Sequence, residues 1–376
     1  MTTTMASKMR TAADGANTLA DRMRDAADQE LQRLRYQLSP LAATVDGACS
    51  EYSAPPHIVA LAGIAMAAAL AVTSDEPPTP RSAQGPQERC TPPGFDTPLA
   101  IECAQLSGLT YQQDPEVFRA ELREMGLTLL SEFEDKKQET YAYLAQRADQ
   151  VFLVFRGSWS VKNALTDIDY QHCDSFQELA RLSMPQGVKL HRGFLSAWCG
   201  LREPILAELE RLQATHAHGL RLHVTGHSMG GAMAMLASLE AQHLMEAREE
   251  NPLAQHTTYT FAAPRVGNAQ FAEMYQQAFP ADEAHWALQH SDDAVPHLPF
   301  VAWGYQHPHG VAVLDERQPL RRSGDPGDSV SMLRPKDGSP KNWATIHDTS
   351  VYVDRMRALI SLDGLPQPSA QPAWGI

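Results

Sequence analysis

A serine flanked by glycines at position 228 is the residue best suited to act as a nucleophile. In Gly226-His227-Ser228-Met229-Gly230, one glycine stands two residues before the hydroxyl and another two residues after it. Glycines at these positions leave room for a sharp turn, and the side chain between them projects from its tip. A serine hydroxyl still needs a base to take its proton, an acid to hold that base, and donors for the oxyanion.

Candidates for these three roles lie at the ends of expected strands. Phe155-Arg-Gly-Ser158 ends an apolar run, and its Gly-Ser turn is suited to an oxyanion loop. Downstream, Asp292 and Asp293 follow the expected strand at 286–290, and either could be the acid. His347 precedes a helical run and is the one suitably late histidine. The resulting order of Ser, Asp and His is that of α/β-hydrolases.

The stretches around these residues predict strands and helices in alternation. Leu220, Leu222 and Val224 alternate with polar residues and predict a strand, whereas 232–249 lacks Gly and Pro and predicts a helix. Further strands are expected at 127–130, 139–144, 150–155 and 259–261, and a further helix at 99–109. This alternation predicts an α/β protein built on a mixed sheet.

The composition limits the partners and cofactors that we expect. The 376 residues are 43% hydrophobic and 20% charged, which suits a globular protein, and the net charge of −14 argues against nucleic acid as a partner. The cysteines form no Cys-x-x-Cys pair, so a zinc or redox motif has no support, although one disulfide stays open. His307 and His309 have no acidic or sulfur partner at ligand spacing, so we expect no metal. The five cysteines are Cys49, Cys90, Cys103, Cys173 and Cys199.

The first 75 residues predict an α-helical extension. Residues 1–40 show an amphipathic helical pattern, and 58–72 is an uncharged, Ala-rich apolar run. As a helix, the run at 58–72 would span only about 22 Å, short of a bilayer core of about 30 Å. We therefore favour a buried or interface helix, with a membrane anchor as the alternative, and residues 1–75 are a candidate docking segment for a membrane or a protein partner.

The N-terminus lacks the apolar core of a secretory signal peptide. This predicts a cytoplasmic protein or one exported by a leaderless route, with membrane association through 58–72 as the alternative. Residues 76–97 are rich in proline and predict a linker. The main domain is then expected at 98–362, followed by a tail at 363–376.

Several motifs lie in order along the chain: Phe155-Arg-Gly-Ser158, the segments 188–194 and 226–231, Phe261-Ala-Ala-Pro-Arg-Val-Gly-Asn268 and Asp293-Ala-Val-Pro-His-Leu-Pro299. Together they resemble the class 3 lipases, the fungal-type lipases, over roughly residues 98–360. The resemblance implies an α/β-hydrolase fold with a central, mostly parallel sheet flanked by helices. It also implies Ser228 as the nucleophile, Asp293 as the acid and His347 as the base, since the Asp-x-Val-Pro-His pattern selects Asp293 over Asp292.

The same resemblance implies an oxyanion hole and a lid. The oxyanion donors would be Ser158, through its amide and its hydroxyl, and the amide of Met229. A helical lid would occupy 159–169, with the apolar side chains of Trp159, Val161, Leu165 and Ile168 covering the substrate. Ala164 stands where the fungal enzymes usually carry a large aromatic residue, a departure that argues against tight lid closure and strong interfacial activation.

Other polar residues in these motifs have structural interpretations. His227 is expected to pack beside the turn and not to act as the base, and Arg265 and Asn268 to tie loops together. Three further histidines are expected to form structural hydrogen bonds: His191, His297 and His309.

The function implied is a serine ester hydrolase that cleaves fatty-acyl esters of lipids, such as triacylglycerols, at a lipid–water interface. Water would release the acyl group, and neither a metal nor an organic cofactor is needed. Phospholipase A1 and short-chain carboxylesterase are the nearest alternatives, because the serine motif encodes neither chain length nor head group. A delivered lipase effector and a non-catalytic binding protein of the same fold are two further alternatives.

Overall fold

The structure is a computed structural model, and it describes residues 91–158, 172–174, 179, 182, 184–216, 219–246, 253–279, 284–290, 293–308, 311–315, 318–323 and 346–362. The N-terminal extension, most of the Pro-rich linker, the lid at 159–169 and the tail at 363–376 lie outside these residues, as do Asp292 and His309. The expectations about those segments and residues therefore stay predictions.

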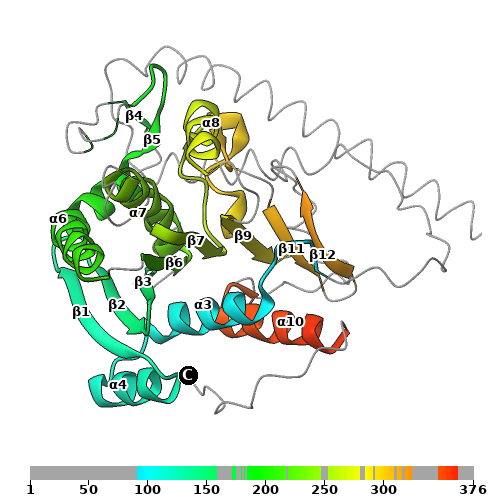
Figure 1. Cartoon of the computed structure of the whole chain (residues 1–376). Coiled ribbons are helices and arrows are strands. Elements are labelled where there is room, and N and C mark those ends of the chain that lie inside the picture. The colour runs from blue at the N-terminus through cyan, green and yellow to red at the C-terminus, as the bar shows by residue number, and fades with distance from the viewer. Residues whose placement is uncertain are drawn as a thin grey trace, which may run out of the picture. The chain divides into compact units, whose positions relative to one another are not determined.

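Eight strands of the described chain form one sheet in the order β1-β2-β3-β6-β7-β9-β11-β12 (Figure 1). From β3 to β11 the neighbouring strands run parallel, whereas β1, β2 and β12 pair antiparallel at the edges. The predicted mostly parallel sheet is confirmed. Its strands are β1 (Thr128–Asp135), β2 (Thr140–Arg147), β3 (Gln150–Phe155), β6 (Leu220–His227), β7 (Leu253–Phe261), β9 (His285–His290), β11 (Val311–Asp315) and β12 (Gln318–Ser323).

Strand β3 is apolar throughout because both of its faces are covered. Val151, Leu153 and Phe155 contribute to the core on one side of the sheet, and Phe152 and Val154 to the core on the other side. All five side chains are fully buried. A strand buried on both faces carries a continuous apolar run and not an alternating one, as expected in a parallel sheet.

Helices cover both faces of the sheet (Figure 1). One core joins the sheet to α6, α7 and α8, and a second core joins it to α3 and α10. A small second sheet has the order β10-β8-β5-β4. These elements are α3 (Thr97–Leu109), α6 (Arg192–Thr215), α7 (Met229–Glu246), α8 (Ala269–Ala278), α10 (Thr349–Leu362), β4 (His172–Cys173), β5 (Leu190–His191), β8 (Gly267–Asn268) and β10 (Tyr305–Gln306).

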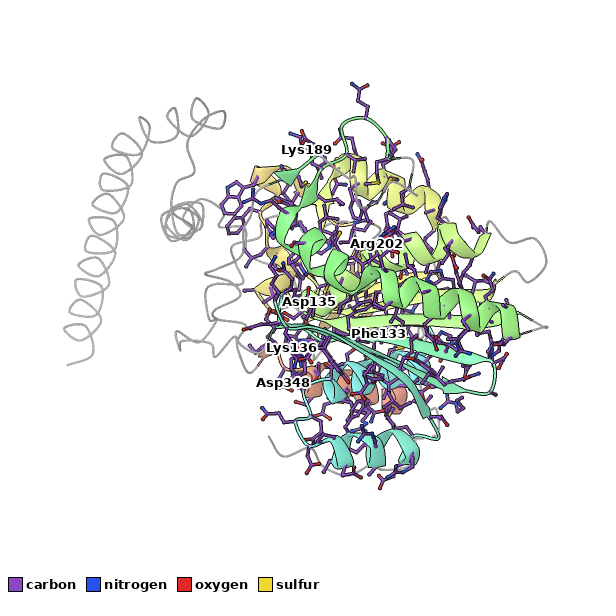
Figure 2. The ribbon with its side chains drawn as sticks, turned by 90° about the vertical axis from the view of Figure 1, so that its left-hand side faces the viewer. Phe133, Asp135, Lys136, Lys189, Arg202 and Asp348 are labelled. Atoms are coloured by element: carbon purple, nitrogen blue, oxygen red, sulfur yellow. The ribbon has the colours of Figure 1, made fainter. Side chains whose placement is uncertain are left out.

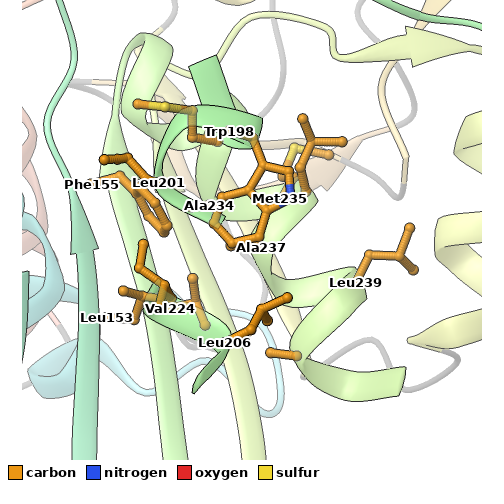
Figure 3. Close-up of a cluster of buried hydrophobic side chains, with 14 of the residues drawn as sticks. Leu153, Phe155, Trp198, Leu201, Leu206, Val224, Ala234, Met235, Ala237 and Leu239 are labelled. Atoms are coloured by element: carbon orange, nitrogen blue, oxygen red, sulfur yellow. The ribbon is translucent and has the colours of Figure 1, made fainter. Parts of the chain in front are cut away.

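The core under α6 and α7 combines large side chains with small ones of α7. Figure 3 shows Phe155 of β3 and Trp198 of α6 in this core, with their ring centroids 5.9 Å apart. Ala234 and Ala237 of α7 lie in the same cluster, and both are fully buried. Small residues allow α7 to lie close to the sheet, and this holds the start of the helix at the end of β6.

A buried ion pair ties α6 to α7. Nε of Arg202, a residue labelled in Figure 2, donates to Oε2 of Glu240 at 2.6 Å, and the Arg202 Nη2 donates to Oε1 at 2.7 Å. Nε1 of Trp198 donates to the same carboxylate at 2.7 Å. The Glu240 side chain is only 2% exposed, so these donors replace the water that the charge has lost.

Some elements differ from the predictions. The helix expected at 232–249 spans Met229–Glu246 in the structure. It begins earlier than expected because the glycines of the serine motif are tolerated in its first turn. The helix α4 (Pro115–Glu124) and the β11–β12 hairpin were not predicted. Among the described residues, no helix has the length and apolar character needed to cross a membrane.

Candidate active site

Ser228 occupies a strained turn between β6 and α7. It is the single residue between the end of β6 at His227 and the start of α7 at Met229, and its φ is +58°. A non-glycine residue at positive φ is uncommon and persists only where its surroundings enforce it. A Cβ on Gly226 would overlap the main chain of Gly230, so the motif needs glycine there. The serine is thereby held at the carboxyl end of the parallel strands.

His347 and Asp293 form a buried pair at the same end of the sheet. The Nδ1 atom of His347 lies 2.8 Å from Oδ2 and 3.1 Å from Oδ1 of Asp293. Asp293 follows β9, and His347 precedes α10 by two residues. The Asp293 side chain is 0% exposed and the His347 side chain 1% exposed. A carboxylate at this distance fixes the imidazole as the Nδ1–H tautomer.

The Asp293 carboxylate is stabilised in its charged form. Burial by itself would raise its pKa, but His347 and two further hydrogen bonds outweigh burial and hold the pKa below its usual value. The Tyr352 hydroxyl donates to Oδ2 at 2.7 Å, and the amide of Val295 donates to Oδ1 at 3.0 Å. Asp293 can therefore stay ionised and stabilise a positive charge on His347.

The second nitrogen of the His347 ring is available as a base. Within the described part of the chain, Nε2 of His347 is buried and has no hydrogen-bond partner. Because Nδ1 carries the proton that Asp293 accepts, Nε2 has a free lone pair. The His347 ring also lies against His227, the neighbour of Ser228, with 4.5 Å between the ring centroids.

The strand end that carries Ser158 lies beside the serine turn. Phe155 pairs with Gly226 in the parallel register of β3 and β6. A Cβ on Gly157 would come within 3.1 Å of Cβ of Ser228, so the two segments are in close contact. The Ser158 hydroxyl donates to the Met229 sulfur at 3.5 Å. The Met229 amide opens α7, and amides of a first turn have no intrahelical acceptor.

Three other residues from the sequence motifs, and His307 outside them, form structural contacts. Nδ1 of His191 accepts a hydrogen bond from the amide of Phe194 at 3.3 Å and caps α6. Oδ1 of Asn268 accepts from the amide of Phe271 at 3.1 Å and caps α8. Arg265 donates to the main-chain oxygen of Pro299 at 2.9 Å. Nε2 of His307 lies 2.7 Å from the main-chain oxygen of Pro296.

Sequence reasoning missed one residue at the site and underused another. Tyr111 lies just past α3, and its hydroxyl is 3.1 Å from Nδ1 of His227. Tyr352 lies in the helical run expected after His347, and its hydroxyl donates directly to Asp293. Tyr111 carried no sequence signal, because it lies 116 residues from its partner.

Comparisons with known proteins identify relatives of this chain. A family model described as "Lipase (class 3)" matches residues 152–303. The secreted mono- and diacylglycerol lipase A of Penicillium cyclopium is 32% identical over 190 residues, which are 50% of this chain and 56% of that protein. A lipase of Rhizopus oryzae is 29% identical over 183 residues, 48% of this chain and 43% of that protein. The chain thus spans about half the length of these curated relatives.

Solved structures of fungal lipases share the fold. A Rhizomucor miehei lipase in complex with its propeptide superposes with a TM-score of 0.53 at 21% identity, covering 67% of this chain and 80% of that one. Lipase II from Rhizopus niveus gives a TM-score of 0.53 at 22% identity, covering 67% and 94%. The α/β-hydrolase fold expected from the sequence is confirmed.

Proposed function

We propose that the chain is a serine hydrolase of carboxylic esters of the class 3 lipase type, because a class 3 lipase family model matches residues 152–303. The observation that carries the proposal is the buried pair of His347 and Asp293, in which the His347 ring lies against His227, the residue before Ser228, and its Nε2 has no hydrogen-bond partner among the described residues. An imidazole oriented by a carboxylate close to a serine held at the tip of a strand–helix turn is the arrangement that acyl transfer requires.

In the first half of the reaction, the Ser228 oxygen attacks the ester carbonyl while Nε2 of His347 takes the serine proton. Asp293 stabilises the imidazolium that forms and does not itself become protonated. The carbonyl oxygen becomes an oxyanion, which Ser158 and the amide of Met229 stabilise. Removal of one such donor costs about 3–4 kcal/mol of transition-state stabilisation.

The tetrahedral intermediate then collapses. The bond to the alcohol oxygen breaks, and His347 returns its proton to that oxygen, which leaves an acyl group on Ser228. Water attacks the acyl-enzyme as His347 accepts a proton from it, and the second collapse releases the carboxylic acid and regenerates the serine. Every proton in this cycle passes through Nε2 of His347.

We propose fatty-acyl esters of glycerol as the substrate class. This rests on the relatives, among which the protein of Penicillium cyclopium is named a mono- and diacylglycerol lipase. The triad acts only on the ester carbonyl, so triacylglycerols, phospholipids and short-chain esters would undergo the same steps. Binding of the acyl chain must decide among them.

The proposed mechanism and the proposed substrate class can be tested together. The assay measures hydrolysis of p-nitrophenyl esters of graded chain length, of a triacylglycerol and of a phospholipid. Ser228→Ala should lower kcat/KM by about 10⁴-fold or more, since removal of a triad nucleophile leaves only residual catalysis. Ser238→Ala is the matched control, because Ser238 is a buried serine of α7 that bonds Thr258 at 2.7 Å away from the triad. Full activity in Ser228→Ala contradicts the proposed mechanism, and the preferred chain length separates lipase from esterase.

We further propose that residues 1–75 attach the enzyme to a membrane or to a protein partner. The support is the apolar run at 58–72, which contains no charged residue. Fractionation of the full chain against a chain that begins at Pro93 tests this. An equal distribution of both proteins between soluble and membrane fractions contradicts the membrane form of the proposal.

A further inference from the structure

The Tyr111 hydroxyl connects the end of α3 to the turn that carries the nucleophile. Its oxygen lies 3.1 Å from Nδ1 of His227, and the two rings meet edge to face with centroids 6.0 Å apart. Nε2 of His227 in turn lies 2.6 Å from the main-chain oxygen of His347. One imidazole therefore bridges a tyrosine and the backbone of the proposed base.

The direction of each hydrogen bond in this bridge is determined. A carbonyl oxygen only accepts, so Nε2 of His227 must carry hydrogen. Burial, and next His347, lower the pKa of His227 to about 3, so the ring is neutral and Nδ1 accepts from Tyr111. Burial also raises the pKa of Tyr111, which keeps its proton, and the amide of Gly157 donates to the Tyr111 oxygen.

The bridge is a continuous chain of hydrogen bonds that runs from the Gly157 amide through Tyr111 and His227 to the carbonyl of His347. Its members alternate as donor and acceptor, which strengthens each bond in the chain. The contacts are tight, because a Cβ on Gly157 would overlap both the Tyr111 hydroxyl oxygen and the main-chain oxygen of His227.

Each end of this chain is joined to one part of the proposed catalytic machinery. Gly157 precedes Ser158, the proposed oxyanion donor, and His227 precedes Ser228. The last acceptor is the carbonyl of His347 itself. Gly157 follows β3, His227 ends β6, and His347 precedes α10. More than 60 residues of chain separate each of these residues from the next, so their relative positions depend on contacts such as this bridge.

We propose that Tyr111 and His227 are positioning residues, which hold the oxyanion strand end, the nucleophile turn and the base at fixed separations. The inference rests on the proposed hydrolase function. Neither residue touches the substrate in this account. A displacement of about 1 Å in a catalytic group costs about 10²-fold in rate, so loss of the bridge should lower kcat while substrate binding is retained.

The direct test is Tyr111→Phe, which removes one oxygen and keeps the ring. With a soluble p-nitrophenyl ester, kcat should fall about ten- to hundred-fold while KM changes less than about two-fold. Tyr143→Phe is the control: the Tyr143 side chain is fully buried, and its hydroxyl donates to the main-chain oxygen of Leu106 in α3 at 3.0 Å. Both variants lose hydrogen bonds of a tyrosine hydroxyl, two at Tyr111 and one at Tyr143, so both should lower Tm, but only Tyr111→Phe should lose kcat.

A double-mutant cycle with His227→Leu keeps the test decisive if either residue also affects folding. The leucine removes both hydrogen bonds of His227, so adding Tyr111→Phe to it should lower kcat less than about three-fold. Wild-type kcat in Tyr111→Phe, or an equal loss from Tyr111→Phe in both backgrounds, overturns the proposal. Absence of hydrolysis by the unmodified protein would instead contradict the proposed function itself.

Discussion

Lowering the pH from 8 to 5.5 should destabilise the folded domain, because several histidines of the described residues, among them His191, His223 and His227, are buried in their neutral form. His191, His223 and His227 are 0%, 1% and 4% exposed. Burial is the main cause that lowers the pKa of His191 to about 3, of His223 to about 4 and of His227 to about 3, from an ordinary value of 6.5. Each can bind a proton far more readily in the unfolded chain.

The sign and the size of the effect follow from this difference. Well above pH 6.5 these histidines are unprotonated in both the folded and the unfolded chain, so they do not reduce the free energy of unfolding. Below pH 6.5 only the unfolded chain binds protons at these histidines, and this favours unfolding. At pH 5.5, one unit below the unfolded pKa, each histidine costs about 1.4 kcal/mol. Three such residues cost roughly 4 kcal/mol, a large share of the about 5–15 kcal/mol that stabilises a typical domain.

Urea denaturation followed by tryptophan fluorescence at both pH values measures this loss. The variant His223→Gln shows how much of the lost stability comes from His223. Glutamine does not titrate, and it can keep a hydrogen bond to Thr257, whose hydroxyl lies 2.6 Å from Nδ1 of His223. The difference in unfolding free energy between the two pH values should shrink by about 1.4 kcal/mol in this variant. Equal stability of the wild type at pH 8 and 5.5, or an unchanged pH dependence in His223→Gln, would refute the reasoning.

Two further predictions concern a buried charge and a sulfur atom. Glu240→Gln leaves the Arg202 charge without its buried partner and should destabilise the domain by about 3–5 kcal/mol in urea unfolding, whereas the exposed Glu203→Gln should cost less than about 1 kcal/mol. Similar losses in both would contradict this. Hydrogen peroxide should inactivate the wild type faster than Met229→Leu, because sulfoxide formation places a strong acceptor against the Ser158 hydroxyl. Equal inactivation rates would show that the sulfur does not matter.

The serine turn could be predicted because its causes are local. The glycines of Gly226-His-Ser-Met-Gly230 are required by contacts within the turn and with the neighbouring strand, and a sequence displays such requirements directly. The parallel strands could also be predicted, since burial on both faces demands apolar runs such as that of β3. The Ser-Asp-His order then followed from the positions of candidates at strand ends.

Contacts between distant segments could not be predicted in the same way. Two adjacent aspartates were candidates for the acid, and only the family pattern favoured Asp293, whose buried contact is with His347, 54 positions away in the sequence. The bridge from Tyr111 to His227 likewise requires the packing of α3 against the sheet. No local pattern marks a tyrosine for such a contact, so it became visible only in three dimensions.

The proposed identity of the nucleophile is the central claim, and covalent labelling tests it most directly. A fluorophosphonate reacts with a serine only where a base and an oxyanion hole activate it. Peptide mass spectrometry of the labelled full chain should find one adduct, on Ser228, and none in His347→Ala. A folded wild-type protein that stays unlabelled, or that carries its adduct on another serine, would contradict the account.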